Sequence, residues 1–181
     1  PIALVAIMNL ASIDFTVLSF NYVHAIGWVY TNVSTGLFEE VMLRGICFGV
    51  LYSAWKDRKN GLMKAAICQA IIFGFAHYVN LIKAPFLEVT VQVTYSTFIA
   101  IGFAGLVAYS RSLWPAIALH SLINACGSIN LFFQPNYVAT DMSMASYAII
   151  VVLIAITCAL PGYLLLKKAT AQFSSPNLVT Q

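Results

Sequence analysis

The hydrophobic positions of the chain fall into long apolar segments that are separated by short polar stretches. These segments cover residues 2–33, 34–55, 64–82, 88–109, 115–133 and 143–166. Each is long enough to cross a bilayer as an α-helix, which takes about 20 residues. The pattern therefore predicts an all-α fold, a polytopic transmembrane bundle of about six helices in this chain.

The composition also indicates a membrane protein. Apolar residues make up 61% of the 181 residues and charged residues only 8%, whereas a soluble domain carries roughly 25% charged residues. The net charge of +3 is too small and too scattered for a surface that binds nucleic acid. The four cysteines all lie in apolar segments and form no Cys-x-x-Cys pair, so we expect neither a disulfide framework nor a zinc knuckle.

The polar loops place most basic residues on one side of the membrane. Counted from the loop at 56–64, alternate connections carry Lys56, Arg58, Lys59, Lys64, then Arg111, and then Lys167 and Lys168. The other connections carry Lys83, Glu88 and Asp141. By the positive-inside rule the first group and the C-terminus are cytoplasmic. We expect a multi-pass protein of a cell membrane, and the short, simple architecture favours a bacterial one.

Residues 35–52 concentrate charge where charge is costly, because Glu39, Glu40 and Arg44 lie there within an apolar helix. An ionisable group in a membrane-embedded helix costs about 3 kcal/mol on insertion scales. Glu40 and Arg44 are four residues apart and share a helix face, so they can form an ion pair. Glu39 lies about 100° further round the helix and has no such partner. One carboxylate is then held and the other is free to act; alternatively, both merely satisfy Arg44.

Small residues recur at four-residue spacing in two of the predicted helices. The first row is Gly45 and Gly49, and the second is Ala66, Ala70 and Gly74. Because such rows let the backbones of neighbouring helices approach closely, we expect both rows to be helix contact faces.

Two further polar motifs interrupt the apolar segments. His77 follows Phe73 by four residues, and Asn124 follows His120 by four residues. A lone histidine on an apolar helix is more often a hydrogen-bonded core residue than a catalytic one, and we expect Asp14 and His24 in the first segment to be interfacial or hydrogen-bonded groups of that kind. Polar groups within a bilayer need one another, so motifs on three helices are expected to converge in one site.

The residue types of these motifs fit the hydrolysis of a peptide bond by a glutamate-activated water molecule. A buried carboxylate can serve as a general base near neutral pH, and a neutral imidazole can position the same water or deliver a proton to the leaving amine. Asparagine and a second histidine can donate hydrogen bonds to a developing oxyanion. Phe73 can fix the ring of His77 by packing against it, although ordinary core packing is the more common role of a single phenylalanine in an apolar helix.

Together, the three motifs resemble the CPBP family, also called the abortive-infection family, which includes CAAX-type prenyl endopeptidases and bacteriocin-processing or immunity proteins. The family pattern EExxxR, FxxxH and HxxxN stands here, in that order, as Glu39-Glu40-x-x-x-Arg44, Phe73-x-x-x-His77 and His120-x-x-x-Asn124. The resemblance covers about residues 34–130. With the hydropathy and composition of the remaining segments, we expect an N-terminal transmembrane region (1–33), a catalytic core (34–133), a last loop with a C-terminal transmembrane helix (134–168) and a disordered cytoplasmic tail (169–181).

The resemblance implies an intramembrane protease whose active site is enclosed by the bundle. We expect no cofactor, because the sequence has no HExxH motif and Asn124 is a poor zinc ligand but a good oxyanion donor. By position, Glu39 and His77 would activate water, and His120 and Asn124 would form the oxyanion site. Supporting roles would fall to Glu40, Arg44 and Phe73. The implied partners are the lipid bilayer and a peptide or lipidated-protein substrate, either a prenylated CAAX-type protein or a bacteriocin or leader peptide. The bacterial character of the chain favours the peptide role.

One geometric expectation fits this arrangement poorly. On straight helices, Glu39 and His77 fall toward the outer half of the membrane and His120 toward the cytoplasmic half, roughly 10 Å apart along the membrane normal. Tilt or a break in one helix would close this gap.

Three alternatives stay open on the sequence. Glu39, His77 and His120 can supply three zinc ligands with an open fourth position, although no HExxH motif is present. The fold can also serve as a non-catalytic immunity or scaffold protein that binds a toxin or receptor. A transporter is a weaker alternative, because the chain shows no internal repeat.

Overall fold

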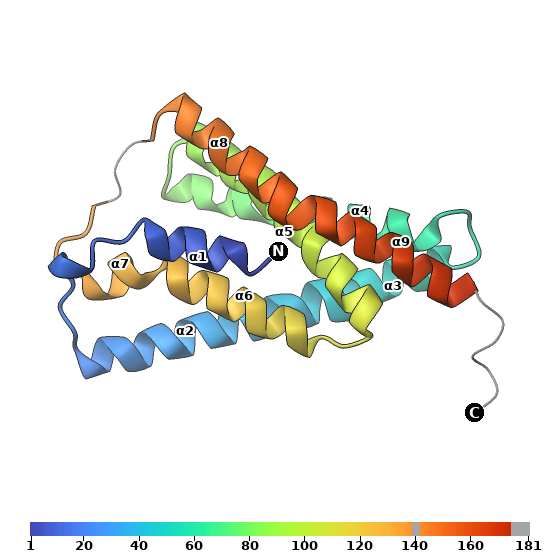
Figure 1. Cartoon of the computed structure of the whole chain (residues 1–181), viewed down its shortest axis with the longest axis horizontal. Coiled ribbons are helices and arrows are strands. Elements are labelled where there is room, and N and C mark those ends of the chain that lie inside the picture. Colours follow the sequence, from blue (N-terminus) through green and yellow to red (C-terminus); the bar gives the residue numbers. More distant parts are fainter. Residues whose placement is uncertain (139–141, 175–181) are drawn as a thin grey trace.

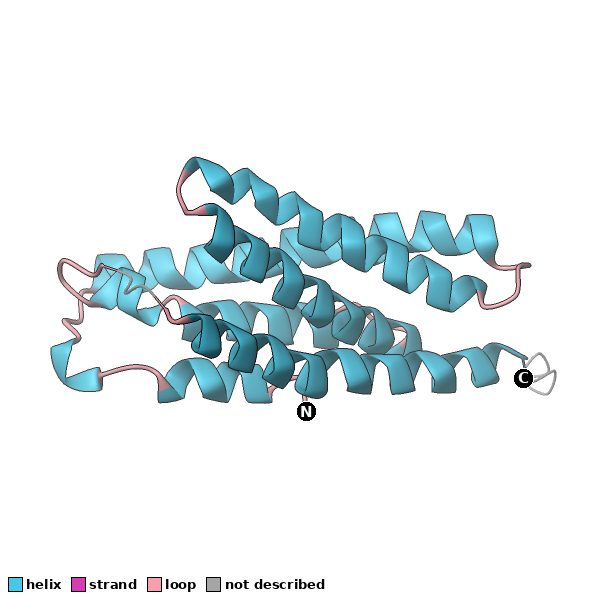
Figure 2. Ribbon diagram, turned by 90° about the horizontal axis from the view of Figure 1, so that it is seen from above, coloured by secondary structure: helices cyan, strands magenta, loops and turns pink. Residues whose placement is uncertain are grey.

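The computed structural model describes residues 1–138 and 142–174, and every regular element within them is a helix (Figure 2). The α-helices are α1 (Leu4–Ala11), α2 (Tyr22–Glu40), α3 (Phe48–Trp55), α4 (Gly61–Ala76), α5 (Phe86–Ser110), α6 (Trp114–Gly127), α7 (Ile129–Phe133), α8 (Met144–Ile154) and α9 (Leu160–Ser174). Short 3₁₀ segments lie at Phe15–Val17 and His77–Ile82, and π-helical segments at Val41–Cys47 and Ala155–Ala159. The predicted all-α fold is confirmed.

The longest segment of the N-terminal half is a helix that runs without a break from Tyr22 to Trp55, through α2, a π-helical segment and α3. The helix boundary that we expected between residues 33 and 34 is therefore wrong, and so is a single spanning helix over residues 2–33. The helix begins instead at Asn21, whose Oδ1 accepts hydrogen bonds from the backbone N–H groups of Val23 (2.8 Å) and His24 (3.4 Å). Such a side-chain cap satisfies the free donors of a first turn.

The chain between α1 and α2 is irregular because Asp14 directs a turn there. Its Oδ1 accepts hydrogen bonds from the backbone N–H and the hydroxyl of Thr16, at 2.9 and 2.6 Å. Asp14 is therefore hydrogen-bonded, but within an exposed local turn and not inside the bundle. These bonds hold the pKa of Asp14 below its ordinary value, so the turn keeps its carboxylate cap at neutral pH and loses it only as the pH falls through that lowered pKa.

Helix α5 lies at the centre of the bundle, packed against α4 on one side and α9 on another, while α2 and α6 lie side by side (Figure 1). The side chains of Ala100, Phe103 and Ala104 on α5 are fully buried. Within the described residues, three helical segments are long and apolar enough to cross a membrane, namely Gly61–Ile82, Phe86–Ser110 and Met144–Gln172. The last of these continues past residue 168, so the start of the predicted disordered tail is wrong. Asp141 and residues 175–181 lie outside the described residues.

One of the two predicted small-residue rows is a contact face and the other is not. Ala66 and Ala70 are fully buried, and a Cβ added at Gly74 would meet the carbonyl oxygen of Val93 on α5 at 2.8 Å. Around Gly49, by contrast, nothing lies within 4 Å of an added Cβ. At Gly45 an added Cβ would meet only the side chain of Leu113, at 3.4 Å. The expectation of close backbone contact is therefore wrong for the Gly45 and Gly49 row, because no helix backbone of the described residues lies opposite either glycine.

The closest helix crossing joins α5 to α9, and it depends on glycine. A Cβ added at Gly162 would meet the Cα of Gly102 at 2.6 Å and its nitrogen at 2.7 Å. We expect Gly162→Ala to lower the free energy of unfolding by about 1–3 kcal/mol, the usual cost of overpacking. Gly49→Ala is the matched control and should leave stability unchanged or slightly raised. Thermal unfolding in detergent micelles measures both, and equal effects of the two substitutions would contradict this packing.

Candidate active site

The charged residues of the first motif form a buried ion pair. The guanidinium of Arg44 donates from Nη1 to Oε1 of Glu40 at 2.8 Å, and neither side chain is exposed. The Arg44 Cζ also lies 4.7 Å from the ring centre of Phe73 and 5.3 Å from that of Phe103. The predicted pairing of Glu40 with Arg44 is confirmed, and two aromatic faces help to hold the cation.

A π-helical segment, Val41–Cys47, follows the two glutamates directly and contains Arg44. In such a segment the backbone hydrogen bonds span five residues, so the helix is locally wider than an α-helix. π-Helical turns are rare and occur frequently at functional sites. Their presence here marks the glutamate motif as a place where the helix departs from its most stable geometry.

His120 on α6 contacts both glutamates. Its Nδ1 donates to Oε1 of Glu40 at 2.6 Å, and its Nε2 lies 3.5 Å from Oε2 of Glu39. Glu39 therefore has a partner, which we did not expect, and the predicted separation of roughly 10 Å between Glu39 and His120 is wrong.

The reason for this proximity is the tight antiparallel packing of α2 against α6. A Cβ added at Gly36 would meet the backbone nitrogen of Ser121 at 2.9 Å, so glycine lets the two helices approach one turn from the glutamates. This approach brings the imidazole of His120 level with both carboxylates. The straight-helix estimate failed because it placed each helix separately and could not include their crossing.

The two carboxylates differ in access to the surroundings. The Glu40 side chain is fully buried, whereas 30% of the Glu39 side chain is exposed. The His120 side chain lies between them and is 9% exposed. Of the two glutamates, only Glu39 therefore presents a carboxylate that water or a substrate can reach.

The second motif contacts His120 through the side chain of Phe73. The Nδ1 of His77 donates to the Phe73 carbonyl oxygen at 2.9 Å, which leaves Nε2 of a neutral ring as an acceptor. The two rings meet edge to face, with centres 4.8 Å apart, and the Phe73 ring also meets the ring of His120 at 6.2 Å. The Phe73 ring thus contacts both histidine rings. The sequence predicted its contact with His77 but not its contact with His120.

Asn124 completes the set of sequence-predicted residues. It lies one helical turn after His120 on α6 and is half-buried, and its side chain makes no hydrogen bond to any other described residue. Its amide is therefore available to a ligand. All three motifs are brought together around Phe73 and His120, although the structure records no direct contact of His77 with Glu39.

A polar clamp between α2 and α6 was not predicted from the sequence. Asn32 donates to the Trp28 carbonyl at 2.7 Å and to the hydroxyl of Ser128 at 3.0 Å, and Ser128 donates back to Oδ1 of Asn32 at 3.2 Å. Asn32 precedes Glu40 by eight residues, so the two share a helix face. That spacing was a usable signal, and the clamp fixes α6 in the register that His120 needs.

A second missed residue is Gln69, which precedes Phe73 by one turn on α4 and is fully buried. Its side-chain amide donates to the carbonyl oxygens of Ala66 at 3.0 Å and of Ala100 on α5 at 3.3 Å. Burying a hydrogen-bonded amide costs less free energy than burying an unpaired one. The hydrogen bond of Gln69 to Ala100 also joins the helix that carries Phe73 and His77 to α5.

A metal site is not preformed in the described part of the chain. No group of three His, Cys, Asp or Glu side chains there is arranged to hold one metal ion. In the zinc alternative the ligands would be Glu39, His77 and His120. Nε2 of His120 and Oε2 of Glu39 lie 3.5 Å apart, which is compatible with two ligands of one zinc ion, but no third ligand such as His77 joins them in the described structure.

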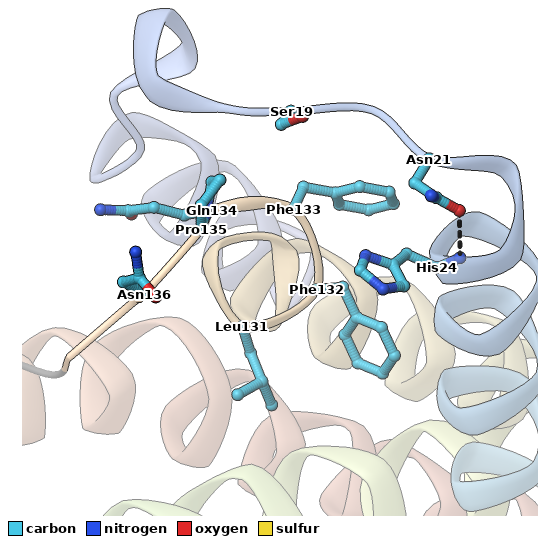
Figure 3. A pocket seen from close by; sticks show the side chains of 9 residues that line it. All are labelled: Ser19, Asn21, His24, Leu131, Phe132, Phe133, Gln134, Pro135 and Asn136. Carbon is cyan, nitrogen blue, oxygen red and sulfur yellow. Dashed lines mark hydrogen bonds between the residues drawn. The ribbon is translucent and has the colours of Figure 1, made fainter.

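A cavity of about 320 Å³ lies away from these residues, between the start of α2 and the chain around α7 (Figure 3). Figure 3 shows the His24 ring beside Phe132 and Phe133 on its wall. His24 precedes Glu39 by fifteen residues on one helix, which corresponds to about 22 Å. The cavity is therefore not part of the site, and His24 is an exposed residue at its edge.

Comparison of the sequence with known proteins identifies its family. The family model described as type II CAAX prenyl endopeptidase Rce1-like matches residues 21–126. The matched range begins at the cap of α2 and includes all three motifs. A search of curated proteins gives no match to the chain. No solved structure matches it either.

Proposed function

Because the chain belongs to the type II CAAX prenyl endopeptidase Rce1-like family, we propose that it hydrolyses a peptide bond of a prenylated substrate with a water molecule activated by Glu39. The observation that carries this proposal is the position of His120, which contacts a buried glutamate with one ring nitrogen and an accessible glutamate with the other. The result is one reachable carboxylate beside an oriented imidazole, the pair that general acid–base catalysis requires.

The proposed reaction starts with Glu39 accepting a proton from water. The water oxygen attacks the scissile carbonyl carbon, and the carbonyl oxygen becomes an oxyanion. Collapse of this intermediate breaks the carbon–nitrogen bond, and the proton held by Glu39 passes to the leaving amine. His77, whose Nε2 is the acceptor while Nδ1 donates to Phe73, takes part in positioning the water.

Glu40 has a defined task in this proposal, namely to orient His120. Glu40 is held by Arg44 and accepts the Nδ1 proton of His120, so the imidazole ring presents Nε2 to Glu39 and the substrate. With Nδ1 occupied in this way, Nε2 can donate to an oxyanion only when the ring carries both protons. We assign that donor role to the imidazolium form of His120, with the free amide of Asn124 as the second donor.

The substrate assignment follows the family match, which names prenyl endopeptidases. The role in processing bacteriocin or leader peptides that the sequence favoured stays a prediction, as do the cytoplasmic C-terminus and the bacterial origin.

The experiment that tests the proposal compares peptides in cleavage assays with the purified protein in detergent. The peptides are a farnesylated CAAX peptide, the same peptide without the farnesyl group and a double-glycine leader peptide, each with and without a strong chelator. We expect cleavage of the farnesylated peptide only, directly after the lipidated cysteine and unaffected by chelation. Cleavage of the leader peptide alone would overturn the substrate class, and activity that chelation abolishes and zinc restores would overturn the metal-free mechanism.

A further inference from the structure

The α3–α4 loop and the last turns of α9 lie at the same end of the bundle (Figure 1). Basic residues are concentrated in both segments. The sequence places Lys56, Arg58, Lys59 and Lys64 in and just after this loop, and Lys167 and Lys168 near the end of α9. The only acidic residue in these two stretches is Asp57. This end of the protein therefore carries a strongly positive potential, which attracts anions.

A cavity of about 220 Å³ opens within this basic end. Its lining includes Tyr52, Lys56, Arg58, Asn60, Gly61 and Thr170. Neither Lys56 nor Arg58 forms an ion pair with a carboxylate of the described residues. Two cationic side chains thus line one cavity, and no carboxylate of the described residues pairs with either. A phosphate group, which can accept hydrogen bonds from both side chains, suits this arrangement.

The start of α4 adds backbone donors to the same cavity. Asn60, with a φ of 59°, precedes the helix and provides no side-chain cap. The N–H of Gly61 donates to the carbonyl oxygen of Arg58 at 2.9 Å, whereas the N–H groups that follow it in the first turn have no side-chain cap. The positive end of the helix dipole therefore lies at the cavity. Helix starts of this kind bind phosphate oxygens readily.

The position of the cavity along the membrane normal indicates which phosphate it meets. Gly61 is the first residue of one candidate membrane span, and Thr170 lies close to the end of another, Met144–Gln172. The cavity therefore lies where the spans end, at the level of lipid headgroups. We propose that it binds the phosphate of an anionic phospholipid, held by Lys56, Arg58 and the first turn of α4. This inference does not depend on the proposed protease activity.

The test measures lipid binding to the intact protein. Thermal unfolding in dodecyl maltoside micelles is followed while dioleoyl phosphatidylglycerol, dioleoyl phosphatidylcholine or inorganic phosphate is added. We expect phosphatidylglycerol to raise the melting temperature, with little effect of the other two. Because each basic residue near a membrane surface contributes roughly fivefold to the binding of anionic lipid, Lys56→Gln/Arg58→Gln should weaken the apparent affinity by about 30-fold.

Two control variants keep the test specific. Lys59→Gln/Lys64→Gln removes the same charge from the same end but outside the cavity lining, and it should bind phosphatidylglycerol nearly as the wild type does. Lys56→Arg/Arg58→Lys keeps both charges and should retain binding, which separates lost binding from lost folding. An equal loss in both neutralised variants would show diffuse attraction and overturn the site. An equal effect of inorganic phosphate would overturn the lipid assignment.

Discussion

Replacing Glu39 with glutamine is expected to lower kcat/KM for cleavage of the farnesylated peptide by about 10²–10⁴-fold, the usual contribution of a general base. The amide has nearly the shape of the carboxylate but cannot take a proton from water. Its contact with Nε2 of His120 is a partly exposed one, so folding should be little affected. Initial rates at several substrate concentrations, together with thermal unfolding of the same preparation, measure both effects.

The matched control for this substitution is Glu88→Gln. Glu88 lies in the first turn of α5, within the described structure but outside the three motifs. The same chemical change there should leave kcat/KM within about twofold of wild type, because a carboxylate near a helix start contributes only a few tenths of a kcal/mol to stability. Wild-type activity in Glu39→Gln would remove Glu39 from the mechanism and leave His77 as the candidate base.

Removing Arg44 is expected to have the largest effect on stability. Arg44→Ala leaves the carboxylate of Glu40 buried without its cation, and breaking a buried ion pair from one side costs about 3–5 kcal/mol. The aromatic contacts of the guanidinium with Phe73 and Phe103 are lost as well. Chemical or thermal unfolding in detergent should show this loss directly.

The double variant Glu40→Leu/Arg44→Met separates the stability of the ion pair from its role in catalysis. Replacing both charges with apolar side chains of similar volume is often neutral for stability, so most of the lost stability should return. Activity should not return, because His120 has lost the carboxylate that orients its Nδ1. A double variant that is both stable and fully active would show that Glu40 and Arg44 serve packing alone.

The parts of the site that depend on local spacing were predictable from the sequence. The Glu40–Arg44 pair follows from a four-residue interval on a helix. The convergence of the motifs follows from the cost of isolated polar groups in a bilayer, since His120 reaches both glutamates. Even the tie between Phe73 and His77 rests on a four-residue interval.

The parts that depend on contacts between distant segments were not predictable in this way. The hydrogen bond between His120 and Glu40 joins residues 80 positions apart and needs the close approach of α2 and α6 at Gly36. The π-helical segment Val41–Cys47 has no composition of its own that distinguishes it from an α-helix. Its register emerges only when the whole helix is packed.

The sequence contains a capping residue at the start of α2, but the apolar pattern around it suggested a continuous helix. The run of apolar residues across positions 2–33 suggested one helix, yet Asn21 is a preferred capping residue and caps α2 in the structure. Hydropathy reports which residues prefer lipid, and it does not report where the backbone hydrogen bonds of a helix begin. Capping side chains inside apolar segments therefore need to be considered before helix boundaries are drawn.

The central claim, that water activated by Glu39 attacks the peptide bond directly, is tested by one single-turnover experiment in ¹⁸O-labelled water. Excess protein cleaves the farnesylated peptide once, and mass spectrometry locates the label in the product and in the peptide that contains Glu39. Direct attack by water predicts one ¹⁸O atom in the new carboxyl group of the product and none in Glu39. Label in Glu39 with an unlabelled product would show that Glu39 is a nucleophile and would contradict the account.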